Sequence, residues 1–286
     1  MLTYTWSALE PTPQRYALDQ IREAIAFFTA RRINIYLGIQ LINTVKRETP
    51  SDLLTVPFDA AQIRARFRAL LDRLQPLLTA NVKYLAIGNE VDVYLEAHPA
   101  EWATYQIFYE DGLAYVHQKF PSLLVGVAAT YDGASGASQA QLARLNTQSD
   151  VVIYTYYPLR ADFQVHSPQA PRTDFPHMLT LAAGKPVVLQ EVGFPSDPLN
   201  GSSEAMEAEF VTHVLTAWRA AGARMPFLSY FLEHDFDNDT CDLLLSYYEL
   251  PDQAFKAYLC SLGLRRADGS AKPAWDRFIA GAKGNP

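Results

Sequence analysis

The sequence has little of several features that would each point to a particular class of protein. It holds only 2 cysteines and 14 glycines in 286 residues, and its acids outnumber its bases, giving a net charge of −7. Two cysteines cannot build a disulfide framework, and an acidic chain lacks the basic face that nucleic acid requires. We therefore expect two free thiols at Cys241 and Cys260, with a single bridge as the alternative, and no nucleic-acid partner.

Long apolar runs and cofactor motifs are missing as well. No run reaches the roughly 18 apolar residues of a membrane span. The N-terminal MLTYTWSALEP lacks the charged leader and apolar core of a signal peptide, so the protein either stays in the cytoplasm or is exported with a leader outside this chain. No glycine-rich phosphate turn, HExxH motif or Gly-x-Ser-x-Gly elbow occurs, which argues against nucleotide binding, a catalytic zinc and a serine hydrolase. We expect no cofactor and no metal.

What the sequence does contain is a regular alternation of two kinds of segment. Its 49% hydrophobic and 19% charged residues predict a folded chain with a large core and exclude intrinsic disorder. Continuous apolar runs, typical of parallel strands buried on both faces, cover residues 2–6, 33–40, 82–87, 123–129, 151–156, 186–190 and 226–231. Segments with the 3.6-residue period of helices cover residues 16–31, 60–78, 101–119, 137–146, 173–183, 203–222, 252–262 and 273–281.

Strands that alternate with helices predict an α/β fold with a parallel sheet and right-handed crossovers. Such a sheet is either open and doubly wound or closed into a TIM barrel, a (β/α)₈ fold. The missing phosphate turn counts against the first, and the chain length suits the second. We therefore expect one (β/α)-barrel catalytic domain over residues 1–286, in which about seven strands are found instead of eight.

Two glutamates stand where an apolar strand ends. Glu90 follows Gly88 and Asn89, and Glu191 is followed by Val192 and Gly193. A barrel places its chemistry at the C-terminal ends of its strands, so two such glutamates three strands apart are expected to face each other. Hydrolysis of a glycosidic bond needs two opposed carboxyl groups, one that protonates the leaving oxygen and one that attacks the anomeric carbon or activates water. A lone glutamate here would more simply be a solvated loop charge or a helix cap.

These motifs resemble the retaining glycoside hydrolases of clan A. The likeness extends to Leu2–Pro11 as the second strand of a barrel with its loop, to the tyrosines near 154–157 as the sixth strand, and to the last helices near 262–275. Within the clan, the tyrosines resemble those of galactanases and the Glu-Val-Gly-Phe-Pro-Ser stretch resembles the β-1,3-glucanase group. The resemblance implies a retaining β-glycosidase that cleaves an oligo- or polysaccharide by double displacement.

The resemblance also implies roles for individual residues. Glu90 would be the acid/base, Glu191 the nucleophile, and Asn89 the ligand of the sugar 2-hydroxyl. A tyrosine on the sixth strand would hydrogen-bond the nucleophile; we expect Tyr156 in this role, with Tyr157 as the second choice.

Other residues are candidates on chemical grounds alone. Aromatic faces pack against sugar rings, which makes Trp6 and Phe231 candidate platforms, with core packing as the alternative. Gln40, with Asn43 close by, could bind sugar hydroxyls, although both could equally cap a loop. The acidic stretch 233–242 imitates the start of a calcium loop but lacks its glycine and its bidentate glutamate. We expect it to be a loop that forms a polar rim of the sugar cleft.

If Glu90 follows strand 4 and Glu191 strand 7, the chain begins at strand 2. A barrel without its first strand has open edges. The chain is then a truncated hydrolase, or its own C-terminal segment covers the gap, or a second copy covers it in a homo-oligomer. Three alternative functions stay open: a catalytically impaired carbohydrate-binding barrel, an inverting hydrolase and a transglycosylase.

Overall fold

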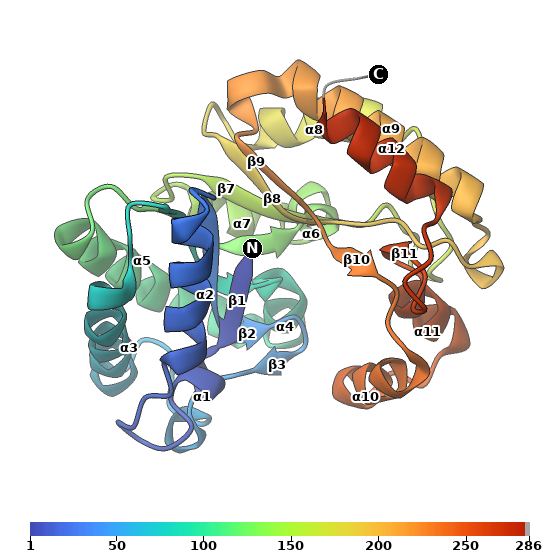
Figure 1. Ribbon diagram of the computed structural model, residues 1–286. Coiled ribbons are helices and arrows are strands. Elements are labelled where there is room, and N and C mark those ends of the chain that lie inside the picture. The colour runs from blue at the N-terminus through green and yellow to red at the C-terminus, as the bar shows by residue number, and fades with distance from the viewer. Residues whose placement is uncertain (284–286) are drawn as a thin grey trace. The chain divides into compact units, whose positions relative to one another are not determined.

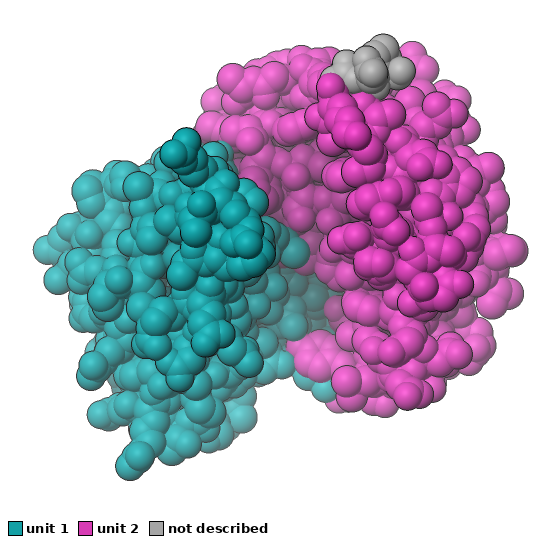
Figure 2. All heavy atoms as spheres, viewed as in Figure 1, with its two compact units in different colours: residues 1–155 teal, residues 156–286 magenta. Residues whose placement is uncertain are grey.

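The computed structural model describes residues 1–283, so the last three residues of the expected domain lie outside it. Helices and strands alternate along the described chain (Figure 1). They form two compact units, residues 1–155 and residues 156–286, which are coloured separately in Figure 2. No helix in the described part is long and apolar enough to cross a lipid bilayer.

Unit 1 is built on parallel strands. One sheet has the order β1-β2-β4-β5, with the short β3 antiparallel to β2, and β6 pairs in parallel with β7. In register, Leu37 of β2 lies beside Leu2 of β1 and Leu85 of β4. The strands are β1 (Leu2–Thr5), β2 (Ile35–Asn43), β3 (Lys46–Arg47), β4 (Val82–Asn89), β5 (Leu124–Gly126), β6 (Ala128–Thr130) and β7 (Val152–Tyr156).

The helices of unit 1 follow the predicted apolar period. In α3 the side chains of Ile63, Phe67, Leu70 and Leu74 are all buried, as the 3.6-residue spacing requires. The helices are α1 (Trp6–Leu9), α2 (Asp19–Ala30), α3 (Ala61–Leu74), α4 (Val91–Ala97), α5 (Trp102–Lys119), α6 (Tyr131–Ser135) and α7 (Gln139–Asn146), with 3₁₀ turns η1 (Ser51–Leu53), η2 (Gln75–Leu77) and η3 (Pro99–Glu101).

Unit 2 continues the alternation. β8 pairs in parallel with β9, and β10 with β11. α9 and α12 pack together around Leu215, Leu264 and Ala274. The elements are α8 (Pro171–Leu181), β8 (Val187–Val192), η4 (Pro198–Asn200), α9 (Glu204–Ala221), η5 (Gly222–Arg224), β9 (Phe227–Tyr230), β10 (Leu232–His234), α10 (Asn238–Tyr248), α11 (Gln253–Cys260), β11 (Gly263–Arg265) and α12 (Pro273–Ala282).

The expected fold class is confirmed, since all seven predicted strands are present and the main sheets are parallel. Residues 123–129 divide into two short strands, β5 and β6. Neither unit by itself contains a closed barrel among the described residues. Within unit 1, β1 pairs with β2 alone, and self-association through this edge stays a prediction.

Two expectations about the C-terminal third are wrong. The stretch 233–242 is no open loop: it contains the end of β10 and the start of α10, whose first turn is capped by the Asp237 side chain accepting from the Thr240 amide at 2.8 Å. Cys241 and Cys260 are not free thiols but form a disulfide. Helices α10 and α11 bring the two cysteine Cα atoms to 6.0 Å, an arrangement that a separation of 19 residues does not reveal.

Candidate active site

The Gly88-Asn89-Glu90 motif forms the sharp turn between β4 and α4. Gly88 has φ +92°, and a Cβ there would lie 2.4 Å from Val91 Cγ1 and 2.8 Å from the Tyr105 hydroxyl. Only glycine fits both the backbone and the space. Glu90 follows in the left-handed region, with φ 44° and ψ 47°, which is uncommon for a residue with a side chain and recurs at functional sites.

Both carboxylate oxygens of Glu90 are held by threonine hydroxyls. Thr44, just after β2, donates to Oε2 at 2.7 Å, and Thr155 of β7 donates to Oε1 at 2.7 Å. The neighbouring Asn89 is 5% exposed and donates through Nδ2 to Asn43 Oδ1 at 3.0 Å. The ends of β2, β4 and β7 thus orient the Glu90 carboxylate from two sides.

A second carboxyl group lies in the first turn of α4. Asp92 is 1% exposed, and its oxygens accept from the Thr130 backbone amide at 2.9 Å and from the Thr130 hydroxyl at 2.5 Å. Burial raises the pKa of Asp92 to about 7; the charge of Glu90 acts in the same direction, and the bonds from Thr130 oppose it. Sequence reasoning missed Asp92, because an acid in the first turn of a helix is usually solvated.

Glu191 lies in β8 and is 9% exposed. Its Oε2 accepts from the Tyr157 hydroxyl at 2.7 Å, and its Oε1 accepts from Gln190 Nε2 at 3.0 Å. The glycine of the motif makes room for the tyrosine, since a Cβ on Gly193 would lie 2.6 Å from Tyr157 Cε1. Gln190, Gly193 and Tyr157 therefore fix the orientation of the Glu191 carboxylate.

The expectation that Tyr156 is the hydrogen-bond partner of Glu191 is wrong, and the second choice, Tyr157, holds that place. Tyr156 is buried and donates to Asp174 Oδ2 at 2.6 Å. Tyr156 is the last residue of β7 and Tyr157 follows it; consecutive side chains of an extended chain point to opposite faces.

Replacing Tyr157 by Phe tests this hydrogen bond. A hydrogen bond to a charged group contributes roughly 1.5–3 kcal/mol, so we expect kcat/KM for a β-glycoside to fall roughly 10- to 100-fold. The matched control is Tyr156→Phe, which removes the bond to Asp174 and should leave kcat/KM within about threefold of wild type. Equal losses in the two variants would contradict the assignment of Tyr157.

The remaining candidates fare differently. Trp6 is a core residue, so its expected role as a sugar platform is wrong: it is fully buried, its ring packs against Phe67 and Phe108, and its Nε1 donates to Glu10 Oε2 at 3.0 Å. Phe231 is partly exposed and packs edge-to-face on Tyr157, with ring centroids 5.8 Å apart. Gln40 is partly buried near the end of β2. Sugar contacts by Phe231, Gln40 and Asn89 stay predictions.

A buried ionic cluster in unit 2 was not expected from the sequence. The Lys272 ammonium, on a residue 2% exposed, donates to Ser196 Oγ at 2.9 Å and to Asp235 Oδ1 at 2.8 Å, and it lies 3.5 Å from Glu207 Oε2. Burial raises the pKa of Glu207 to about 8, and the Lys272 charge opposes this rise. Ser196 belongs to the segment that follows Glu191, so the cluster ties this segment to α9, to the end of β10 and to the start of α12.

The acidic residues after β10 do not gather as metal ligands. Asp235 bonds to Lys272 and to the Gly263 amide, whereas Asp237 caps α10. Among residues 1–283, no group of three His, Cys, Asp or Glu side chains could hold a metal ion.

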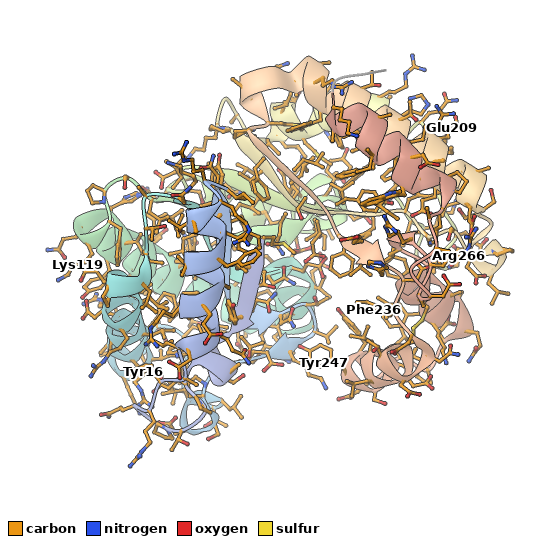
Figure 3. All side chains as sticks on the ribbon, in the orientation of Figure 1. Tyr16, Lys119, Glu209, Phe236, Tyr247 and Arg266 are labelled. Carbon is orange, nitrogen blue, oxygen red and sulfur yellow. A yellow bond between two sulfur atoms is a disulfide. The ribbon has the colours of Figure 1, made fainter. Side chains whose placement is uncertain are left out.

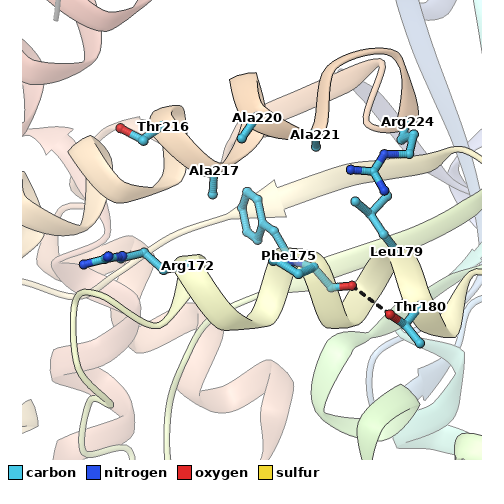
Figure 4. Close-up of a pocket in the computed structure, with 10 residues that line it drawn as sticks. Arg172, Phe175, Leu179, Thr180, Thr216, Ala217, Ala220, Ala221 and Arg224 are labelled. Atoms are coloured by element: carbon cyan, nitrogen blue, oxygen red, sulfur yellow. Dashed lines mark hydrogen bonds between the residues drawn. The ribbon is translucent and has the colours of Figure 1, made fainter.

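A separate groove lies between α8 and α9 (Figure 4). It encloses about 520 Å³ and is lined by apolar side chains such as Phe175 and Leu179, with Arg172 and Arg224 among its polar residues. None of the candidate site residues lines it, so it has no part in the chemistry considered for Glu90 and Glu191.

Comparisons with known proteins bear on the fold. No protein-family model matches the chain, and no curated protein sequence matches it. Several solved structures are similar. One is a GH5_18 protein from Bifidobacterium longum subsp. longum in complex with Manβ1-4GlcNAc, with a TM-score of 0.74, 18% identity, and coverage of 98% of this chain and 68% of that one.

Two further structures extend the comparison. An exo-β-1,4-mannosidase from Opitutaceae bacterium strain TAV5 has a TM-score of 0.72, 18% identity, and coverage of 99% of this chain and 52% of that one. The β-glycosidase BGL167 has a TM-score of 0.69, 14% identity, and coverage of 99% of this chain and 82% of that one. The likeness is one of fold, and it confirms the barrel-type α/β architecture that the alternation of strands and helices predicts.

Proposed function

We propose that the protein is a retaining β-glycoside hydrolase in which Glu191 is the nucleophile and Glu90 is the acid/base. One observation carries the proposal: each of these strand-end glutamates has both carboxylate oxygens held by neighbouring donors, Thr44 and Thr155 for Glu90, Tyr157 and Gln190 for Glu191. The glycoside hydrolase fold supports it. We further propose that residues 1–286 work as one catalytic domain.

The proposed reaction is a double displacement. A Glu191 oxygen attacks the anomeric carbon while Glu90 gives its proton to the leaving oxygen, so that a covalent glycosyl-enzyme forms and the leaving sugar departs. Glu90 then takes a proton from water, whose oxygen attacks the anomeric carbon and releases Glu191. Asn89, oriented by Asn43, is proposed to bind the sugar 2-hydroxyl, a contact that strengthens in the transition state. The scheme needs no cofactor.

The proposed substrate is a β-linked oligo- or polysaccharide. The similar structures include one in complex with Manβ1-4GlcNAc and one named as an exo-β-1,4-mannosidase. β-Mannosides are therefore the first substrates to try, followed by β-glucans, galactans and xylans.

The acid/base role of Glu90 predicts a dependence on the leaving group. In Glu90→Ala, hydrolysis of a β-linked disaccharide should fall roughly 10²- to 10⁴-fold, because its leaving oxygen needs a proton. Formation of the glycosyl-enzyme from a 2,4-dinitrophenyl β-glycoside should be far less affected, because that leaving group departs without one. The measurement is kcat/KM for both substrates. An equal fall in kcat/KM for the disaccharide and for the 2,4-dinitrophenyl glycoside would contradict the acid/base role of Glu90.

A further inference from the structure

The segment between β10 and α10 is held at both of its ends. Asp235 Oδ1 accepts from the Gly263 amide at 2.7 Å and from Lys272 Nζ at 2.8 Å. Cys241 is tied to Cys260 by the disulfide, and its sulfur lies 3.9 Å from the Phe236 carbonyl oxygen. With Asp237 capping α10, few backbone torsions of this segment are free. A side chain carried here is therefore preorganised.

Phe236 is the aromatic side chain on this anchored segment (Figure 3). It lies at the end of a row of rings that starts at the candidate nucleophile. Tyr157 bonds to Glu191, the Tyr157 and Phe231 ring centroids are 5.8 Å apart, and the Phe231 and Phe236 centroids are 6.4 Å apart. Both ring pairs are edge-to-face, with interplanar angles of 88° and 82°. The row therefore leads from Glu191 through Tyr157 and Phe231 to Phe236.

Phe236 is only partly buried, unlike the core aromatic residues Phe194 and Phe210. An edge-to-face contact with Phe231 uses the edge of one ring of the pair and leaves aromatic surface for a ligand. The CH face of a sugar packs well on such a surface, while its hydroxyls seek polar partners. Two exposed acids are close to Phe236 in the sequence: Asp237, which caps α10, and Glu233, whose carboxylate lies 3.6 Å from Arg265 Nε. Carboxylates of this kind can accept hydrogen bonds from sugar hydroxyl groups.

We propose that Phe236 is the stacking platform for a second sugar residue of the substrate, an inference that rests on the proposed hydrolase activity. It makes the protein selective for oligosaccharides over simple glycosides of one sugar. The anchored segment 235–241 holds the platform in place, and Phe231 joins it to the surroundings of Glu191.

The test compares two substrates of the same sugar, a 4-nitrophenyl β-glycoside and the matching tetrasaccharide. Phe236→Ala should lower kcat/KM for the tetrasaccharide roughly tenfold more than for the aryl glycoside. Phe236→Tyr keeps the aromatic ring, so its kcat/KM values for both substrates should stay close to those of wild type. Phe27→Ala is the matched control, since it removes a phenylalanine that is 50% exposed on α2; it should not change the ratio of the two values. An unchanged ratio in Phe236→Ala would overturn the inference.

A binding measurement separates this inference from the proposed function. Calorimetric titration of Glu191→Gln with manno-, cello-, galacto- and laminaritetraose should show binding of one of them, weakened roughly tenfold by Phe236→Ala. If a tetraose binds in a way that depends on Phe236 but the wild-type protein hydrolyses no substrate, the proposed hydrolase activity is wrong and the proposed role of Phe236 is supported. If no tetraose binds, or if binding does not depend on Phe236, the platform is wrong even where aryl glycosides are cleaved.

Discussion

Glu191→Gln is expected to lose hydrolysis almost completely, with kcat falling roughly 10⁴- to 10⁶-fold, because an amide cannot form the glycosyl-enzyme. Glutamine keeps the size of the side chain, and its oxygen can still accept from Tyr157, so the fold should be retained. The measurement is kcat on the best β-glycoside from the substrate screen, with circular dichroism to check folding.

Glu209→Gln is the matched control for this variant. Glu209 lies on α9 with a side chain 45% exposed, beside His213, and Figure 3 labels it. The Glu209→Gln variant should hydrolyse the same substrate with a kcat within about twofold of the wild-type value, because surface substitutions away from special features have small effects. A kcat of Glu191→Gln equal to that of Glu209→Gln would exclude Glu191 as the nucleophile.

Lys272→Met is expected to have the largest effect on stability. It leaves the Asp235 carboxylate, whose side chain is 13% exposed, without its cation and removes the buried ammonium beside Glu207. Removing one partner of a buried ion pair costs about 3–5 kcal/mol. Urea unfolding at pH 7 measures the loss. Burial raises the pKa of Asp235, and the bond from Lys272 opposes this rise, so without lysine the pKa should rise further. The difference in free energy of unfolding between wild type and Lys272→Met should therefore become smaller as the pH is lowered and Asp235 takes up a proton.

Lys256→Met is the control for the Lys272 prediction. Lys256 pairs with Asp242, whose side chain is 64% exposed, and an ion pair at the surface contributes about 0–1 kcal/mol. If Lys272→Met costs no more than Lys256→Met, the buried cluster does not anchor the segment after Glu191.

The elements that carry the fold were predictable because their apolar periods are strong. The strand at 82–87 and the helix at 60–78 appear as β4 and α3 almost as expected. Residues 233–242 were misjudged because their acids look like a solvated loop, whereas Asp237 acts as a helix cap and the apolar run Leu243–Leu245 follows within α10. The disulfide was given only as the alternative to free thiols, because it depends on how α10 and α11 pack, which no local pattern encodes.

The candidate site was predictable at its two glutamates and less so around them. Glu90 and Glu191 were visible because each ends an apolar strand beside a glycine that the turn or a neighbouring ring requires. Thr44, Thr155 and Gln190 were missed because single polar residues near strand ends are common. The choice of Tyr156 over Tyr157 failed because the sequence does not say which of the two side chains points toward Glu191.

The most direct test of the proposed mechanism is to trap the covalent intermediate. The protein is incubated with 2,4-dinitrophenyl 2-deoxy-2-fluoro-β-mannoside and with the corresponding glucoside, and its peptides are analysed by mass spectrometry. A retaining hydrolase with Glu191 as nucleophile should release dinitrophenol in a burst equal to the enzyme concentration and carry the fluorosugar on the peptide that contains Glu191. A fluorosugar on another residue, or turnover of the parent glycoside with inversion at the anomeric carbon, would contradict it.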